Sequence, residues 1–352
     1  MMRTAMLTIG ILIPLFFSHV FAEETADRLF QKGNAARKAG RQEEAISHYK
    51  KALEIKPDLA MVHLNLGVAF VNLGKFNDAV DAFKHAIAIK PDYPLAYYNL
   101  AAAYGNLDNY QEEVKAYKKA IEINPQFADA YYNLGLTHGK HEQFKEAADA
   151  LREVTKLNPK NFDAYVNLGV AYEGLGENKK AVDVLTQAIA INPTDETVYY
   201  NLGMAHSKLK NYQEAADAYK KVLKINPQHV LAHYVLGASY IMLGEYQHAV
   251  DTYTEYIKLN PDTAEAYVNL GYAYRKLGRN REAVDSFKKA LKIKPDFAKA
   301  HYNLGITYSN ADDKESALNT YRVLEKIDKD KADKLLKIIS KHKEKKGISK
   351  EP

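Results

Sequence analysis

The 352-residue sequence contains no cysteine and no tryptophan. The absence of cysteine excludes disulfides, thiolate metal sites, iron–sulfur clusters and cysteine nucleophiles, and it also excludes anchoring through a lipidated cysteine. Glycine and proline are sparse, at 18 and 11 residues, which excludes a collagen-like or low-complexity chain. With 47% hydrophobic and 26% charged residues, the composition is that of a protein that folds.

The formal net charge of +5 is concentrated near the C-terminus. Residues 329–352 contain nine lysines and four acidic residues, and the body of the chain before them is close to neutral. A neutral body does not favour a nucleic-acid-binding protein. The lysines at 341, 343, 345 and 346 are expected to form a solvated basic tail, and contact with an anionic lipid or glycan stays an alternative.

The N-terminus has the pattern of a secretory leader. Arg3 is followed by an apolar stretch from Met6 to Phe17 and by the small residues Val20 and Ala22 at the −3 and −1 positions. We therefore expect a signal peptide over residues 1–22 and an exported, periplasmic or secreted protein. An uncleaved N-terminal membrane anchor is the alternative. We expect no membrane span after the leader is removed.

Prolines recur every 34 residues through most of the chain. They are Pro57, Pro91, Pro125, Pro159, Pro193, Pro227, Pro261 and Pro295. This period predicts nine tandem repeats without an insertion. The repeats are 26–59, 60–93, 94–127, 128–161, 162–195, 196–229, 230–263, 264–297 and 298–331. We number the positions of each repeat as places 1 to 34.

Each repeat predicts two helices joined by a short turn. In the fifth repeat, apolar residues follow a 3–4 spacing in two stretches that flank Gly176. Glycine at place 15 is expected to supply a turn with positive φ, and the proline at place 32 is expected to end the second helix. Small residues at place 8 are expected to face small residues at place 20, so that the two helices approach closely.

The pattern resembles the tetratricopeptide repeat family. The resemblance rests on Tyr or His at place 4, Leu at 7, Gly or Ala at 8, an aromatic residue or His at 11, Ala at 20, Phe, Tyr or Leu at 24, Ala at 27 and Pro at 32. Glu113 at place 20, and Val222 and Tyr256 at place 27, depart from it. The resemblance implies an all-α fold, a right-handed α-solenoid superhelix of nine helix-turn-helix repeats. Residues 332–352 then form a C-terminal solvating helix and the basic tail.

The resemblance also implies that the first helices line a concave groove. Place 6, which should face this groove, is asparagine in seven repeats: Asn65, Asn99, Asn133, Asn167, Asn201, Asn269 and Asn303. Place 5 carries Tyr98, Tyr132, Tyr200, Tyr234 and Tyr302. The asparagine row is similar to the asparagine ladder of the O-GlcNAc transferase repeats. Amides beside tyrosines suit the backbone of an extended polypeptide. Asparagines that bond within or between repeats, and tyrosines that only pack between repeats, are the alternatives.

Several apolar residues predict anchor pockets in the second and seventh repeats: Met61, Leu64, Leu231, Ile241 and Met242. The lysine and asparagine pattern of repeats that grip a terminal carboxylate is absent. His138 with His141, and His229 with His233, have helical spacings that can bind a metal, but they occupy packing or helix-start places. We therefore expect no metal and no cofactor, and no motif points to an enzyme.

We interpret the sequence as a non-catalytic protein–protein interaction scaffold that binds extended polypeptide segments outside the cytoplasm. A role in envelope assembly or polysaccharide export follows from family analogy alone. The alternatives are an RNA-binding helical-repeat protein, which the neutral body opposes, and a self-assembling structural scaffold. Homo-oligomerisation stays open.

Overall fold

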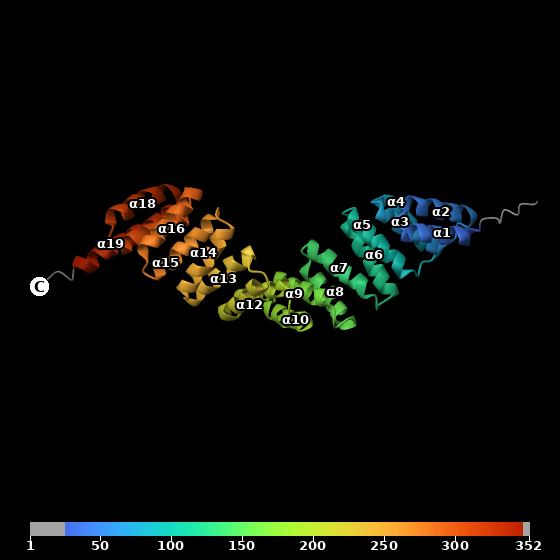
Figure 1. Ribbon diagram of the computed structural model, residues 1–352, viewed down its shortest axis with the longest axis horizontal. Coiled ribbons are helices and arrows are strands. Elements are labelled where there is room, and N and C mark those ends of the chain that lie inside the picture. The colour runs from blue at the N-terminus through green and yellow to red at the C-terminus, as the bar shows by residue number, and fades with distance from the viewer. Residues whose placement is uncertain (1–24, 348–352) are drawn as a thin grey trace, which may run out of the picture. The chain divides into compact units, whose positions relative to one another are not determined.

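The computed structural model describes residues 25–347, and within this range every regular element is an α-helix (Figure 1). The expected leader, residues 1–22, lies outside the described residues, as do the side chains of the basic tail beyond Lys341. The helices are α1 (Ala26–Lys38), α2 (Gln42–Ile55), α3 (Ala60–Asn72), α4 (Phe76–Ile89), α5 (Pro94–Asn106), α6 (Tyr110–Ile123), α7 (Ala128–Lys140), α8 (Phe144–Leu157), α9 (Phe162–Gly174), α10 (Asn178–Ile191), α11 (Glu196–Lys208), α12 (Tyr212–Ile225), α13 (Val230–Leu243), α14 (Tyr246–Leu259), α15 (Ala264–Lys276), α16 (Asn280–Ile293), α17 (Ala298–Asn310), α18 (Lys314–Ile327) and α19 (Lys329–Gly347).

The helix boundaries follow the 34-residue period. Each odd-numbered helix from α1 to α17 begins at place 1 and is the first helix of its repeat, and each second helix ends at place 30. The residue before the proline is extended, as at Lys56 (φ −140°, ψ 94°), because the proline ring disfavours α geometry there. The ninth repeat lacks the proline, yet Asp328 is also extended (φ −154°, ψ 95°). Its carboxylate accepts the backbone N–H of Lys331 at 3.0 Å, and this cap begins α19.

All nine intra-repeat turns have a residue with positive φ at place 15. Five of these residues are glycine, as expected, and four carry a side chain. The glycines are Gly40, Gly74, Gly176, Gly244 and Gly278, and the others are Asp108, Glu142, Lys210 and Asp312. The turn geometry is therefore imposed by the helical hairpin, and glycine only makes it less costly.

The close approach of the two helices at place 8 differs from the expectation. A Cβ added to Gly203 would lie 2.4 Å from a ring carbon of Tyr219, and one added to Gly271 would lie 2.7 Å from Phe287. Both partners occupy place 24. The expected place-20 neighbour is seen at Gly135, where an added Cβ would lie 3.4 Å from the Ala147 backbone oxygen, but a large place-24 side chain lies nearer to the glycine.

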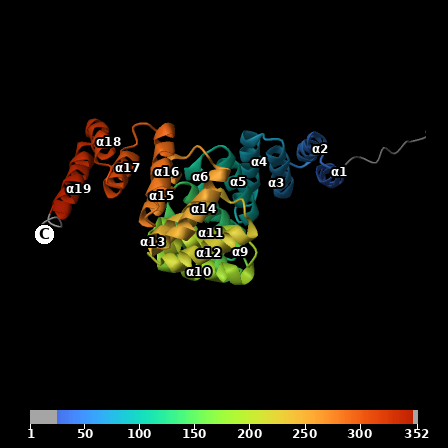
Figure 2. The ribbon, with the colours of Figure 1, turned by 60° about the vertical axis from the view of Figure 1, so that its left-hand side comes forward.

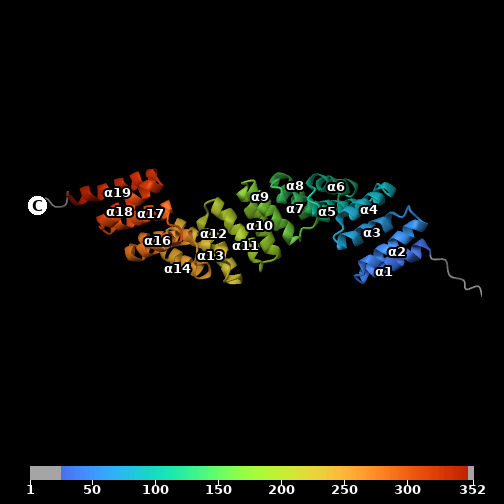
Figure 3. The same ribbon diagram turned by 90° about the horizontal axis from the view of Figure 1, so that it is seen from above.

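The last hairpin is completed by the C-terminal helix, as predicted. Leu335 and Ile339 of α19 are buried, and α19 packs against α17 and α18. Leu335 covers Gly305, where a place-24 side chain covers the glycine in other repeats. Figures 1 and 3 both show α19 running beside α18. This helix removes from water an apolar face that would otherwise have no neighbour.

The contacts divide the chain into two compact parts, with the division after Ala130 inside α7. In the N-terminal part, α2 packs on α3 and α4 packs on α5, so consecutive hairpins stack (Figure 2). In the C-terminal part the same succession runs from α8 to α19. In both parts the core consists of alanines and aromatic or aliphatic side chains between the helices. Among residues 25–347, no helix combines the length and the hydrophobicity that a membrane span requires.

Candidate functional site

One stripe of each first helix stays open to solvent. Places 2, 6, 9 and 13 are separated by four, three and four residues, which places them on one side of an α-helix. We call these side chains of the odd-numbered helices α1–α17 the first-helix face. Met61 and Leu231 at place 2 and Met242 at place 13 are each 57% exposed. Side chains of this size are costly to leave in water, so the face is suited to contact with a partner.

The expected anchor residues divide between this face and the interior. Met61, Leu231 and Met242 lie on the surface, and Ile241 is half-buried. Leu64 is only 4% exposed and belongs to the core of its repeat, so its assignment as an anchor was wrong. Place 5 turns toward the second helix, and a leucine there packs inside the hairpin.

Two asparagines of the ladder have free side chains. Within the described residues, the amides of Asn99 and Asn201 make no hydrogen bond to any other side chain or backbone group. Both are half-buried on the first-helix face. Asparagine in a helix interior costs up to about 0.7 kcal/mol relative to alanine, and here no internal bond offsets that cost.

Other ladder residues use one end of the amide. Asn65 donates its NH₂ group to Asn34 Oδ1 at 2.9 Å. Asn167 donates to the Asp163 backbone oxygen at 2.8 Å and to the Tyr132 hydroxyl at 3.3 Å. The Oδ1 atom of Asn167 accepts no hydrogen bond from the described residues. These bonds orient the amide and leave its oxygen as an acceptor.

The asparagines near the C-terminal end have both ends of the amide occupied. Asn269 donates to the hydroxyls of Tyr234 at 3.3 Å and Tyr253 at 3.1 Å, and it accepts from Lys299 Nζ at 3.5 Å. Asn303, which is 7% exposed, donates to the Lys299 backbone oxygen at 2.8 Å and accepts from Arg275 Nη2 at 3.4 Å. Asn133 is also engaged within the molecule. The asparagines of the ladder therefore differ from repeat to repeat in the hydrogen-bonding groups that they leave available.

The place-5 tyrosines pack within the hairpins. Their rings lie 5.7–5.9 Å from the place-24 ring of the same repeat in the pairs Tyr98–Tyr117, Tyr200–Tyr219 and Tyr234–Tyr253. Burial raises the pKa of Tyr132, Tyr200 and Tyr234. Tyr302 is half-buried beside Arg275. These tyrosines contribute to packing between and within repeats, and their contact with a partner stays a prediction.

A small hollow opens on the first-helix face between α7 and α9. Its volume is about 170 Å³, and its lining includes Gly135, Gly139, Leu136, Val170 and Asn167. Leu136 and Val170 are 38% and 43% exposed. The volume is below the 300–1,000 Å³ typical of small-molecule pockets. It is suited to one apolar side chain, with the free oxygen of Asn167 at its edge.

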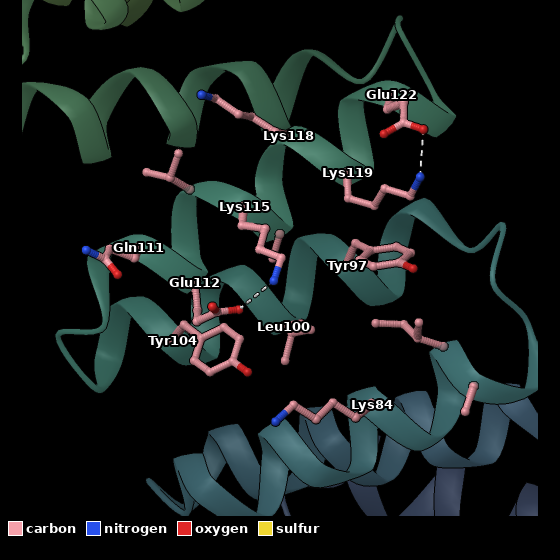
Figure 4. Close-up of a pocket in the computed structure, with 14 residues that line it drawn as sticks. Lys84, Tyr97, Leu100, Tyr104, Gln111, Glu112, Lys115, Lys118, Lys119 and Glu122 are labelled. Carbon is pink, nitrogen blue, oxygen red and sulfur yellow. Dashed lines mark hydrogen bonds and ion pairs between the residues drawn. The ribbon is translucent and has the colours of Figure 1, made fainter.

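A larger hollow lies elsewhere, between the second helices α4 and α6, and the sequence analysis did not identify it. It holds about 770 Å³, with Leu100 and Tyr104 of α5 at its floor (Figure 4). Its rim lysines pair with neighbouring carboxylates, Lys115 with Glu112 at 3.6 Å and Lys119 with Glu122 at 2.6 Å. One feature of the sequence marks this hollow. Lys115 stands at place 22, where six other repeats have aspartate.

The histidines considered as metal ligands have other roles. His229 caps α13 by accepting the Ala232 N–H at 3.1 Å and stacks on Tyr200, while His233 bonds to the Pro227 backbone oxygen at 2.9 Å. His138 is buried, at 5% exposure. No group of three or more potential ligand residues that could hold a metal occurs in the described part of the chain.

Comparison with known proteins identifies repeats along nearly the whole chain. The TPR model of the Cilia and flagella-associated protein 70 C-terminal domain matches residues 21–229. Models described as TPR repeat or tetratricopeptide repeat match residues 200–264, 252–285, 271–311 and 298–331. No curated protein matches the sequence at a significant level.

Several solved structures are similar. A MamA chain is 31% identical and aligns over 49% of this chain and 93% of its own, with a TM-score of 0.46. YrrB, described as a TPR protein with an unusual peptide-binding site, is 23% identical over 53% of this chain and 96% of its own, with a TM-score of 0.50. The C-terminal part of a TPR repeat-containing protein from Cytophaga hutchinsonii is 20% identical over 68% of this chain and 99% of its own, with a TM-score of 0.59.

The last two structures share the helical-repeat fold. The first of the sequence models covers more than half of the chain, and repeat models match most of the remainder. The chain therefore belongs to the tetratricopeptide repeat family.

Proposed function

We propose that the protein is a non-catalytic scaffold that binds an extended polypeptide segment along its first-helix face. The observation that carries this proposal is the hollow of about 170 Å³ between α7 and α9, with the free Oδ1 of Asn167 at its edge. An apolar partner side chain fits such a hollow, while a backbone N–H next to it donates to the amide oxygen.

First helices of both compact parts, each taken by itself, have features that suit the same mode of binding. The first helices α3 and α5 carry no charged residue, and they expose Met61 and Leu95. The amides of Asn99 and Asn201 have no internal partner among the described residues, so each offers a donor and an acceptor. Amides recognise a peptide backbone without regard to its side chains, and the apolar residues then select the anchors.

The leader sequence supports a location outside the cytoplasm, and we include export in the proposal. Antibody detection of the protein in cell fractions tests this point. Export is supported when the mature protein is shorter than the translated chain and is released with the extracytoplasmic fraction. Retention of the full-length chain with cytoplasmic markers would overturn it.

Binding is tested by filling the hollow. A Cβ on Gly139 meets no atom within 4 Å, so the position accepts a side chain. Gly139→Leu is designed to fill the hollow that Gly139 lines, and it removes a helix-destabilising glycine. We expect unchanged or higher thermal stability together with loss of partner binding. Gly139→Ala is the matched control, because it gives the same gain in helix propensity and leaves most of the hollow open.

The partner for this test is found by photo-crosslinking in the native organism, with benzoylphenylalanine in place of Val170 and mass spectrometry of the crosslinked peptides. A synthetic peptide of the crosslinked segment is then titrated against the variants. Equal binding by Gly139→Leu and Gly139→Ala would overturn the site. Crosslinks to nucleic acid only would overturn the function.

The asparagine ladder supplies a second pair of variants. Asn201→Ala removes a free amide, so we expect weaker binding with stability unchanged or higher by up to about 0.7 kcal/mol. Asn269→Ala removes two hydrogen bonds to tyrosines, so we expect a loss of about 1 kcal/mol of stability after the gain in helix propensity. Denaturant unfolding and peptide titration measure both effects. The same loss of stability in the two variants would contradict the division of the ladder.

A further inference from the structure

Three cations lie on the first helices of the eighth and ninth repeats. Arg275 lies near the end of α15 with its guanidinium carbon 5.2 Å from the centre of the Tyr272 ring. Lys276 Nζ lies 5.8 Å from the same ring and 5.7 Å from that of Tyr246. Lys299 of α17 contributes the third charge. We call Arg275, Lys276 and Lys299, with Tyr246, Tyr272 and Tyr302, the cationic cluster.

No carboxylate of the described residues pairs with any of these three cations. The acidic residue of α15 is Glu265, ten positions before Arg275, which is about 15 Å along a helix. Two other arginines of the C-terminal part do have such a partner, Arg279 with Glu282 at 2.8 Å and Arg152 with Asp149 at 2.8 Å. The three cations of the cluster therefore have no ion-pair partner within the described part of the chain.

Arg275 has an unused donor within the cluster. Its Nε atom is buried and has no hydrogen-bond partner among the described residues, while Nη2 donates to Asn303 Oδ1 over a long 3.4 Å. Burial lowers the pKa of Arg275, and neighbouring tyrosines oppose that change. A guanidinium stays protonated in proteins, so the charge persists in a half-buried setting. An unpaired cation of this kind gains from an anionic partner.

We propose that the cationic cluster binds acidic side chains of the partner polypeptide. A glutamate or aspartate carboxylate accepts hydrogen bonds from the Arg275 guanidinium, with Lys276 and Lys299 supplying further positive charge. The tyrosine rings form the walls that exclude water from the ion pair. This inference rests on the proposed function, and it adds that the segment is acidic where it passes α15 and α17.

The saturated asparagines of this region agree with the assignment. Asn269 and Asn303 accept from Lys299 and Arg275 through their oxygens, and both amides also donate within the molecule. They hold the cations in position and have little capacity left for a peptide backbone. Recognition therefore changes along the first-helix face, from backbone-directed amides near Asn201 to side-chain-directed cations near Arg275.

The probes are short rhodamine-labelled peptides that alternate glycine with glutamate, glutamine or lysine, titrated against the full chain by fluorescence anisotropy. We expect the glutamate peptide to bind tightest and its binding to weaken as salt increases. In Arg275→Gln the glutamate peptide should bind about tenfold more weakly, because a charged hydrogen-bonding partner is lost. The glutamine peptide should be unaffected.

Arg279→Gln is the matched control. It removes the same charge from the same repeat, but Arg279 is paired with Glu282 and lies 4.7 Å above the Tyr274 ring. We expect little change in binding. Circular dichroism tests whether both variants fold. If Arg275→Gln does not fold, Arg275→Lys replaces it, because lysine keeps the positive charge but lacks the planar guanidinium. It should weaken binding while keeping the preference for glutamate.

Three outcomes would overturn the inference. They are equal losses in Arg275→Gln and Arg279→Gln, equal affinity for the glutamate and glutamine peptides, and complete competition by inorganic phosphate at concentrations similar to the peptide. The last would mean a general anion site. Because these probes are synthetic, the result is independent of the Gly139→Leu test. If the acidic-peptide test fails, the hollow between α7 and α9 still stands as a peptide site. If the Gly139→Leu test fails, the preference for acidic peptides still stands.

Discussion

Glu173 in α9 and Arg275 in α15 occupy the same place 12 of their repeats and carry opposite charges. Both are half-buried, and each has a side-chain atom, Glu173 Oε1 and Arg275 Nε, that is buried without a hydrogen-bond partner among the described residues. The first helices α9 and α11 carry three carboxylates and one lysine, a net charge of −2. The first helices α15 and α17 carry three cations and one glutamate, a net charge of +2.

The comparison shows that one repeat pattern supports two kinds of surface. The buried places, which set the hairpin, are alike in both regions. The places open to solvent differ in charge and in whether the ladder amide is free, as at Asn201, or occupied, as at Asn269. Under the proposed function, a partner segment would be recognised differently at α9–α11 and at α15–α17.

The largest expected difference between the two regions lies in the packing at place 8. Gly271 is covered by the ring of Phe287, and Gly169 by the branched side chain of Leu185. Gly271→Ala should lower the free energy of unfolding by about 1–3 kcal/mol, because a ring cannot move aside. Gly169→Ala should cost less than about 1 kcal/mol, since a leucine can change rotamer and alanine favours a helix. Urea unfolding of both variants measures this. Equal losses would show that the shape of the place-24 side chain does not decide the cost.

Substitutions in the turns of the two regions should change the stability by smaller amounts and in opposite directions. Gly278 (φ 75°) joins α15 to α16, and Lys210 (φ 63°) joins α11 to α12. Gly278→Ala should destabilise the protein by about 1 kcal/mol, and Lys210→Gly should stabilise it by up to about 1 kcal/mol, because only residues with a Cβ resist this conformation. The midpoints of thermal unfolding report both. A Lys210→Gly variant that is less stable than the parent would mean that the lysine side chain itself contributes to the fold.

The smallest expected effect concerns pH. Burial raises the pKa of Glu173 from its ordinary 4.5 to about 7, although Lys208 partly opposes the shift. The folded state then binds a proton more tightly than the unfolded state, so this contribution to stability is complete below about pH 4.5 and is lost as the pH rises through about 7. Glu173→Gln should match the parent near pH 4.5 and melt about 2 °C higher near pH 8.

Arg275→Gln is the comparison for this pH series. A guanidinium does not titrate in this range, so the difference in melting temperature between Arg275→Gln and the parent should be the same at every pH. A difference that changes with pH in both variants would point to a titrating group other than Glu173.

Much of the hairpin could be predicted from single residue types. Pro57 and its equivalents ended the second helices at place 30, and Gly176 and its equivalents marked the turns. Asp108, Glu142, Lys210 and Asp312 adopt the same turn without glycine, so position within the hairpin mattered more than residue type there. The nearest neighbour of the place-8 glycines, a large side chain such as Phe287, was not predicted, because sequence spacing indicates which side chains share a face but not how far a ring reaches across it.

The candidate site was predictable in outline only. The row of asparagines was evident from the sequence, but Asn201 and Asn269, which are both followed by Leu-Gly, differ in their hydrogen bonds. The difference comes from residues in other helices, such as Lys299, whose distance to the amide is a property of the stacked repeats. Lys115 at place 22 marked the hollow between α4 and α6, but only the packing of three helices created it.

By itself the sequence determined the period, the helices, their ends and the identity of the buried places, because each of these depends on residues close together in the chain. The tertiary structure decided which amides are free, which charges lack a partner and where the surface is hollow. These properties depend on distances between side chains of successive repeats, which local sequence does not specify.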